Sequence, residues 1–144
     1  MTVGDQSGII AAMNAIMGIA LSGLQAATKQ LQVGASNVAN MANRGAVAAD
    51  GTVEAGLYRP QQVVQVATPG GGVQAFARPV DPAFHIVPDP SAALAGNGGR
   101  VAMPNVDLAE QVVEMILAKT AYKANAAVIE VARELDDVLL DIKA

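Results

Sequence analysis

Apolar residues recur at alternating steps of about three and four in two long segments, residues 8–42 and 105–143. This spacing predicts two α-helices, each with one apolar stripe of coiled-coil period. Each helix would extend roughly 50 Å at about 1.5 Å per residue. The stripe of the first segment consists of Met13, Met17, Ala20, Leu24, Ala27, Leu31, Ala35 and Val38, and that of the second of Val113, Leu117, Ala121, Ala124, Val128, Val131, Leu135, Val138 and Ile142.

Charge is distributed differently on the two predicted helices. Lys29 is the only charged residue between Asp5 and Arg44, so the first helix is expected to have protein neighbours on more than one side. The two helices come from the two ends of the chain, and we expect them to pack antiparallel with their stripes facing each other. The second helix also has a polar stripe, formed by Lys119, Lys123, Glu130, Glu134, Asp137 and Asp141.

The middle of the chain has the composition of turns and strands. Residues 44–104 contain all seven prolines and most of the glycines. The glycine-rich run 68–72 separates two β-rich segments and predicts a hairpin. Residues 88–100 are predicted to be a mobile loop. The predicted strands are Leu57–Ala67, Gly72–Val80 and Ala83–Val87, with Val64, Val66, Val73, Phe76 and Ile86 on their buried faces.

These patterns predict an α+β fold that is mainly α. The long N-terminal helix (residues 1–45) and C-terminal helix (105–144) form an antiparallel, coiled-coil-like pair, and a small β-rich insert (46–104) lies between them. Aromatic residues make up only 3% of the chain, whereas 52% of its residues are hydrophobic. Such a chain is better suited to close helix–helix packing than to a core built from large rings. We expect the three segments to form one structural unit.

Composition also excludes several classes of function. The net charge is −4 and the nine Lys and Arg residues are scattered, so the chain has no basic stripe for nucleic acid. It has no cysteine, which excludes disulfides and thiolate chemistry. Together these features favour a protein whose role is association with other proteins.

Residues with catalytic potential are few and scattered. His85 is the only histidine, and without cysteine it cannot form a usual zinc site. The triple glycine Gly70–Gly72 lacks the lysine and hydroxyl residue of a phosphate-binding loop. We therefore predict no catalytic, cofactor-binding or metal-binding residue, no small-molecule substrate and no enzymatic activity. The alternative is a small-molecule-binding or hydrolytic domain around His85.

The N-terminal segment raises the possibility of a membrane helix. Residues 8–28 carry no charge, which a membrane span requires, but polar residues such as Asn14, Ser22 and Gln25 interrupt the segment. A cleaved signal peptide needs a basic start, and the only early charge is Asp5. A helix covered by protein is therefore the favoured interpretation, and a membrane-inserted helix is the alternative.

Three asparagines, Asn37, Asn40 and Asn43, are spaced three apart at the end of the first helix. A buried amide within an apolar seam can fix the alignment of packed helices, at some cost in stability. Alternatively, the asparagines end the helix, with Gly45 as its stop. The pattern favours the alignment role.

Two sequence motifs at the ends of the chain resemble the bacterial flagellar axial proteins, the rod and hook subunits. The N-terminal motif is SGLQAATKQLQVGASNVANMAN, in which Ser36–Asn40 match the S-N-[IVL]-A-N pattern of that family. The C-terminal motif runs from Val101 to Leu140, with the core M-I-x-A-x-x-A-Y-x-A-N. The run Met103–Asp107, the short length and Tyr58-Arg59 at a strand start are most similar to the proximal-rod subunits of the C type. The residues expected to serve subunit packing or to mark the motifs are Leu24, Leu31, Asn37, Val38, Asn40, Asn43, Pro104, Asn105, Val106, Asp107, Met115, Tyr122, Asn125, Val128 and Leu135.

The resemblance implies a structural subunit of the proximal rod of the flagellar basal body. It would polymerise through its terminal helices, with itself and with other rod subunits, and would transmit torque. The resemblance also implies contacts with the export apparatus and the membrane ring, a place in the periplasm, and type III export without a cleaved signal peptide. Another axial protein, such as a hook–filament junction relative or a rod-like paralogue, is the alternative within the family.

Overall fold

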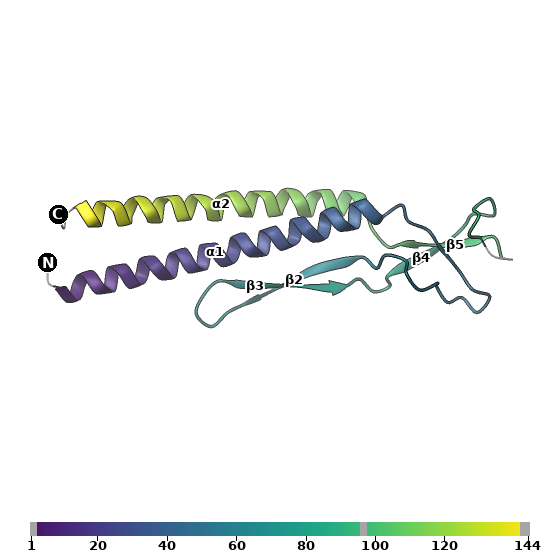
Figure 1. The fold of residues 1–144 in the computed structure, drawn as a ribbon, viewed down its shortest axis with the longest axis horizontal. Helices are drawn as coiled ribbons and strands as arrows, with labels where there is room; N and C mark the ends of the chain where they lie inside the picture. The colour runs from purple at the N-terminus through teal and green to yellow at the C-terminus, as the bar shows by residue number, and fades with distance from the viewer. Residues whose placement is uncertain (1–2, 96–97, 142–144) are drawn as a thin grey trace.

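Two long antiparallel helices and a β-rich insert make up the computed structural model, which describes residues 3–95 and 98–141. Helix α1 spans Val3–Asn40 and helix α2 spans Leu108–Asp141. Figure 1 shows the helices side by side along the long axis, with the start of α1 and the end of α2 at the same end of the molecule. The insert lies between them in sequence. In space, part of it lies at the opposite end of the molecule and part runs back along α1. The predicted α+β, mainly α, fold class is confirmed.

Helix α2 begins at a side-chain cap. The Asp107 carboxylate oxygen Oδ1 accepts hydrogen bonds from the backbone N–H groups of Ala109 (2.8 Å) and Glu110 (3.2 Å). These donors have no partner within the helix, and a negative charge at this end interacts favourably with the helix dipole. Asn105 holds the preceding turn, because its side chain donates to the Pro82 carbonyl oxygen (3.0 Å).

Loss of this cap is expected to weaken the helix pair measurably. Asp107→Ala leaves two N–H groups without their acceptor and should lower the free energy of unfolding by about 1 kcal/mol. Asp107→Ser keeps an acceptor at the same position and should retain most of the stability. Urea denaturation of both variants checks this. Equal stability of the alanine variant and the unchanged chain would contradict it.

Small residues bring the two helices close together. A side chain at Gly23 would collide with Asn125, because an added Cβ would lie 2.5 Å from the Asn125 amide oxygen. At Gly34 an added Cβ would lie 2.9 Å from Met115 Cγ. The buried apolar residues of the two helices are Met13, Ala20, Ala26, Ala27, Val33, Ala118 and Ala132.

A larger side chain at Gly23 should therefore force the helices apart. We expect Gly23→Leu to lower the free energy of unfolding by about 1–3 kcal/mol through overpacking. Gly18→Leu is the matched control, since a Cβ at Gly18 meets no atom within 4 Å. Thermal unfolding of both variants checks the prediction, and equal melting temperatures of the two would overturn it.

The predicted contact stripe of α2 was wrong. Val113, Leu117, Leu135 and Val138 are 55%, 63%, 54% and 56% exposed, respectively. The side that faces α1 instead carries small residues such as Ala118 and Ala132, which are 0% and 3% exposed. Small side chains permit a close approach of the helix backbones opposite Gly23 and Gly34, so this side forms the contact and the bulkier stripe is left outside. In α1 the prediction was partly correct: Met13, Ala20 and Ala27 are buried, whereas Ala35 is exposed.

The insert contains two small antiparallel sheets. Strands β1 (Gly45–Ala46), β5 (Arg100–Pro104) and β4 (Phe84–Pro88) form a three-stranded sheet in the order β1-β5-β4. Strands β2 (Gln61–Ala67) and β3 (Val73–Pro79) form the predicted hairpin, with Val64 opposite Phe76. The hairpin lies along α1 (Figure 1), and its Val73 N–H donates to the Ser22 hydroxyl (3.0 Å).

Three details of the predicted insert were wrong. The first long strand begins at Gln61, so Tyr58-Arg59 precedes the strand rather than opening it. Strand β5 was missed, although Val101 and Ala102 are fully buried. The buried face of the hairpin was misassigned: Val66 and Phe76 are 51% and 46% exposed.

The face of the hairpin that packs against α1 is the face away from Phe76, because this face presents the small residues of the hairpin to the helix. Of the facing pairs, Val63 lies opposite Ala77 and Ala67 opposite Val73, on the side away from Phe76.

Candidate assembly site

A single buried amide joins both helices to the insert. Asn37 is 2% exposed, and its Nδ2 donates to the Gln111 Oε1 (2.8 Å) and to the Gln61 carbonyl oxygen (2.7 Å). Its Oδ1 accepts from the Tyr58 hydroxyl (2.8 Å) and from the Gln61 N–H (3.1 Å). Both amide protons and both lone pairs of Asn37 are therefore used. We call Asn37, Gln111, Tyr58 and Gln61 the Asn37 junction.

The geometry of the junction depends on the alignment of the helices. Gln111 is 8% exposed and lies in the first turns of α2, so its bond to Asn37 fixes which part of α2 stands beside the end of α1. The Gln111 side chain also donates from Nε2 to Glu114 (3.3 Å). A slip of one helix turn would leave buried polar groups without partners, which costs about 1–3 kcal/mol for each group.

The other two asparagines make local contacts. Asn40 Nδ2 donates to the Ser36 carbonyl oxygen (2.8 Å) within α1. Asn43 lies beyond the helix and donates to Asn40 Oδ1 (3.0 Å). Of the three predicted asparagines, only Asn37 thus reaches α2 and the insert in this structure. The sequence analysis did not identify Gln111 and Gln61, and it used Tyr58 only as a mark of the family. A polar residue within the apolar pattern of α2 was the one signal for Gln111.

The remaining predicted packing residues lie at three levels of burial. Pro104 is fully buried at the end of β5, opposite Phe84. Leu24, Leu31, Val38, Val106, Met115 and Asn125 are half-buried. Asn105 and Asp107 are exposed and hold the turn and cap described above. Tyr122, Val128 and Leu135 are 43%, 44% and 54% exposed, respectively.

One flank of α2 is a continuous exposed apolar surface. We call Val113, Leu117, Ala121, Ala124, Val128, Val131, Leu135 and Val138 the α2 stripe. They belong to the stripe that the sequence predicted to face α1, and its last member, Ile142, lies outside the described residues. Every residue of the α2 stripe is exposed. Near the open end of the helix pair, Val128, Val131 and Leu135 line a groove with Met13 and Ile16 of α1, and all of its lining side chains are apolar. Contiguous apolar surface of this kind marks an interaction site.

Helix α1 also meets the length and composition criteria of a membrane span. The candidate segment is Gly8–Asn40, and an 18-residue window within it has a mean hydropathy of 1.7. Core helices of soluble proteins and signal sequences meet the same criteria. In this chain, α2 and the hairpin pack against part of α1.

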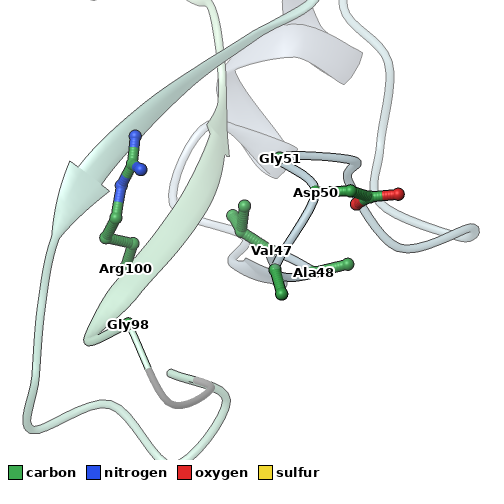
Figure 2. Close-up of a pocket in the computed structure, with 7 residues that line it drawn as sticks. Val47, Ala48, Asp50, Gly51, Gly98 and Arg100 are labelled. Carbon is green, nitrogen blue, oxygen red and sulfur yellow. The ribbon is translucent and has the colours of Figure 1, made fainter.

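A cavity of 480 Å³ lies at the far end of the insert, between residues 47–51 and β5. Figure 2 shows Arg100 and Asp50 among its lining residues, with the Asp50 carboxylate pointing away from Arg100. The Thr52 hydroxyl (2.7 Å) and backbone N–H (2.9 Å) donate to Asp50, and these bonds hold the pKa of this carboxyl below its usual value.

His85 does not line this cavity. It is an exposed residue of β4, opposite Met103. No cluster of three or more metal-ligating side chains was found within residues 3–95 and 98–141.

Comparison with known proteins identifies the family. A family model described as "Flagellar basal body rod FlgEFG protein C-terminal" matches residues 97–142, which contain β5 and α2. The flagellar basal-body rod protein FlgC of Yersinia enterocolitica is 40% identical over 126 residues, covering 83% of this chain and 90% of that protein. This chain belongs to the FlgC family of flagellar basal-body rod proteins.

Further members of the FlgC family match with the same coverage. The FlgC protein of Salmonella typhimurium is 37% identical and that of Escherichia coli O157:H7 is 33% identical, each over 126 residues. The resemblance of the two end motifs to the axial proteins, and to the C type among them, is thereby confirmed. Family membership makes the chain a structural protein of the flagellar basal-body rod.

Proposed function

We propose that this chain builds the proximal part of the rod by packing its terminal helices against those of neighbouring rod subunits. The α2 stripe carries this proposal, because it leaves eight apolar or small residues exposed along one flank of a helix. Burial of such residues typically stabilises an interface by about 25 cal/mol for each Å² of apolar surface removed from water. Isolated helices gain most of their stability from packing, so assembly is also expected to rigidify the open end of the helix pair.

The Asn37 junction gives the subunit a fixed shape for this role. It holds α1, α2 and the start of β2 in one arrangement through four hydrogen bonds. A rod that transmits torque requires subunits whose helices do not slip past each other. We propose that Asn37 supplies this constraint, whereas Asn40 and Asn43 finish the helix end. The described contacts of α1 with the insert and with α2 support treating residues 1–45, 46–104 and 105–144 as one structural unit.

The proposed role is structural rather than catalytic. The lining of the 480 Å³ cavity offers one carboxylate and one guanidinium, and the single histidine lies elsewhere. The relatives, which match 83% of this chain over 90% of their own length, are named as rod proteins. A cofactor or small-molecule substrate is not part of the proposal.

We further propose that the chain reaches the periplasmic rod through the flagellar export apparatus, without a cleaved signal peptide, and contacts the membrane ring at the base of the rod. This route is the one implied by the resemblance of the two end motifs to the flagellar axial proteins. The partners are thus other rod subunits, further copies of this chain, the apparatus and the ring. N-terminal sequencing of the chain from purified basal bodies tests the export route, and a shortened N-terminus would contradict it.

Deletion of the gene tests the proposed function. Cells that lack the chain should be non-motile, with basal bodies that stop before the rod, and the full-length chain should restore both properties. Motile deletion cells with complete rods would contradict the proposal. If the chain instead remained in washed membranes of cells without flagella, the apolar helix α1 would support the membrane alternative.

A further inference from the structure

The helix pair has two uncharged apolar flanks on opposite sides. One flank is the α2 stripe. The other lies on α1 and consists of Ile10, Met17, Leu21, Leu24 and Leu31, which we call the outer α1 face. Ile10 and Leu21 are 50% and 51% exposed, and the other three are half-buried.

Helix geometry places the outer α1 face away from the hairpin. The hairpin turn contacts α1 at Ile19 and Ser22, where side chains at Gly71 and Gly72 would collide. Each residue advances the helix by about 100°, so Leu21 points about 200° away from Ile19. The hairpin and the outer α1 face thus lie on different sides of α1.

The α2 stripe lies on the same side of the helix pair as the hairpin. Ala121 and Asn125 of α2 line a groove together with Ser22 of α1 and with Gln65 and Val73 of the hairpin. Val128 and Leu135 follow Ala121 at steps of seven, so they continue the same flank of α2 along the groove lined by Met13 and Ile16. Two grooves therefore follow each other along this side of the helix pair. Both are lined by α1 and α2, and the hairpin also lines the one at Ala121.

From these positions we infer that the two grooves along the α2 stripe bind the outer α1 face of a second copy of this chain. The inference rests on the proposed function, because it names the partner of the surface proposed to drive assembly. The contact is heterologous, since each copy offers a groove on one side and a helix face on the other. Such contacts do not pair off two subunits but extend from copy to copy.

The distribution of charge favours the outer α1 face as the occupant of the grooves. The alternative is the face of α2 that lies on the same side of the helix pair as the outer α1 face. That face of α2 carries Lys119, Lys123, Glu130, Glu134 and Asp137, which would lose hydration against apolar side chains. The outer α1 face has no charged residue, and Lys29 is the only charge from residue 8 to residue 43. Of the two helix faces on this side of the second copy, the uncharged one is therefore the outer α1 face.

The lengths of the two surfaces also agree. Ile10 to Leu31 spans about 32 Å and Val113 to Val138 about 38 Å at about 1.5 Å per residue. A contact between two α2 stripes would match in length as well, but it would be self-complementary and would close after two subunits. The two arrangements predict different neighbours for Val128, which makes them separable by experiment.

Disulfide crosslinking tests the inference directly, because the chain has no cysteine of its own. Two differently tagged copies, Leu21→Cys and Val128→Cys, are expressed together in the deletion strain, and basal bodies are purified and mildly oxidised. Leu31→Cys with Leu117→Cys forms a second pair. In the control, Lys123→Cys on the charged flank of α2 takes the place of Val128→Cys or Leu117→Cys in each pair.

We expect a crosslink between copies in at least one of the two test pairs, at a yield at least ten times that of the control. Basal bodies that contain both copies but form no α1–α2 crosslink overturn the inference, and a crosslink between two Val128→Cys copies assigns the self-complementary arrangement instead. Neither result affects the proposed function, which is tested separately by the motility and basal bodies of the deletion strain.

Discussion

Replacing Asn37 by alanine is expected to destabilise the chain and abolish motility. The change removes four hydrogen bonds at a residue that is 2% exposed, and it leaves the Gln111 side chain and the Gln61 backbone without their partner. Each buried polar group left unpaired costs about 1–3 kcal/mol, so the free energy of unfolding should fall by about 3 kcal/mol or more. Urea denaturation of the purified chain and swimming in soft agar provide the two measurements.

Asn40→Ala is the matched control for this variant. Both residues are asparagines near the end of α1, but the Asn40 side chain donates only within its own helix, to the Ser36 carbonyl oxygen, and accepts from exposed Asn43. We expect a loss below about 1 kcal/mol and retained motility, as for an ordinary surface substitution. Equal losses at both positions would show that Asn37 has no special role in joining the helices and the insert.

A charge in the α2 stripe should prevent assembly while leaving the isolated chain folded. Val131 is 53% exposed, so Val131→Lys is expected to change the stability of the purified chain by less than about 0.5 kcal/mol. In the assembled rod the ammonium group would be buried against apolar side chains, at a cost of several kcal/mol. The amount of the chain in purified basal bodies should fall at least tenfold, and the cells should not swim.

Glu130→Lys introduces a lysine one residue away, on the charged flank of α2. This variant should enter basal bodies as the unchanged chain does, because its new ammonium group stays among polar neighbours. The comparison separates burial of the stripe from a general effect of charge on the helix. If Val131→Lys were incorporated as well as Glu130→Lys, the α2 stripe would not be an assembly surface.

The sequence was sufficient for the elements whose signal is long and periodic. Two patterns of more than 30 residues predicted both helices and their antiparallel order, and the glycine run 68–72 located the hairpin turn. In each case the determining interaction is local in sequence.

The side of each element that became buried could not be read from the pattern alone. Helix α2 has two apolar sides, and the bulkier one is exposed because the small residues Ala118 and Ala132 allow α1 to come closer. The hairpin likewise turns alanines toward α1 and leaves Phe76 46% exposed. Hydrophobicity predicted the larger residues as core, whereas close backbone approach decided the packing. In an assembling subunit the large apolar residues remain available for neighbours.

The Asn37 junction was likewise predictable only in its local part. The spacing of three asparagines drew attention to the end of α1, but the partner Gln111 is 74 residues away and Gln61 is 24 residues away. Only the folded chain brings these groups together. A short β5 strand was missed for a similar reason, because its partners β1 and β4 are distant segments and its own five residues carry little periodicity.

The most direct test of the central claim is the location of the chain with and without α2. Basal bodies are purified from the deletion strain that expresses either the full-length chain or a chain lacking residues 106–144, and the chain is quantified in each preparation by mass spectrometry. The account predicts that the full-length chain is a rod component in motile cells and that the shortened chain is expressed but excluded from basal bodies. Equal amounts of both chains in the rod, or absence of the full-length chain from basal bodies of motile cells, would contradict assembly through the terminal helices.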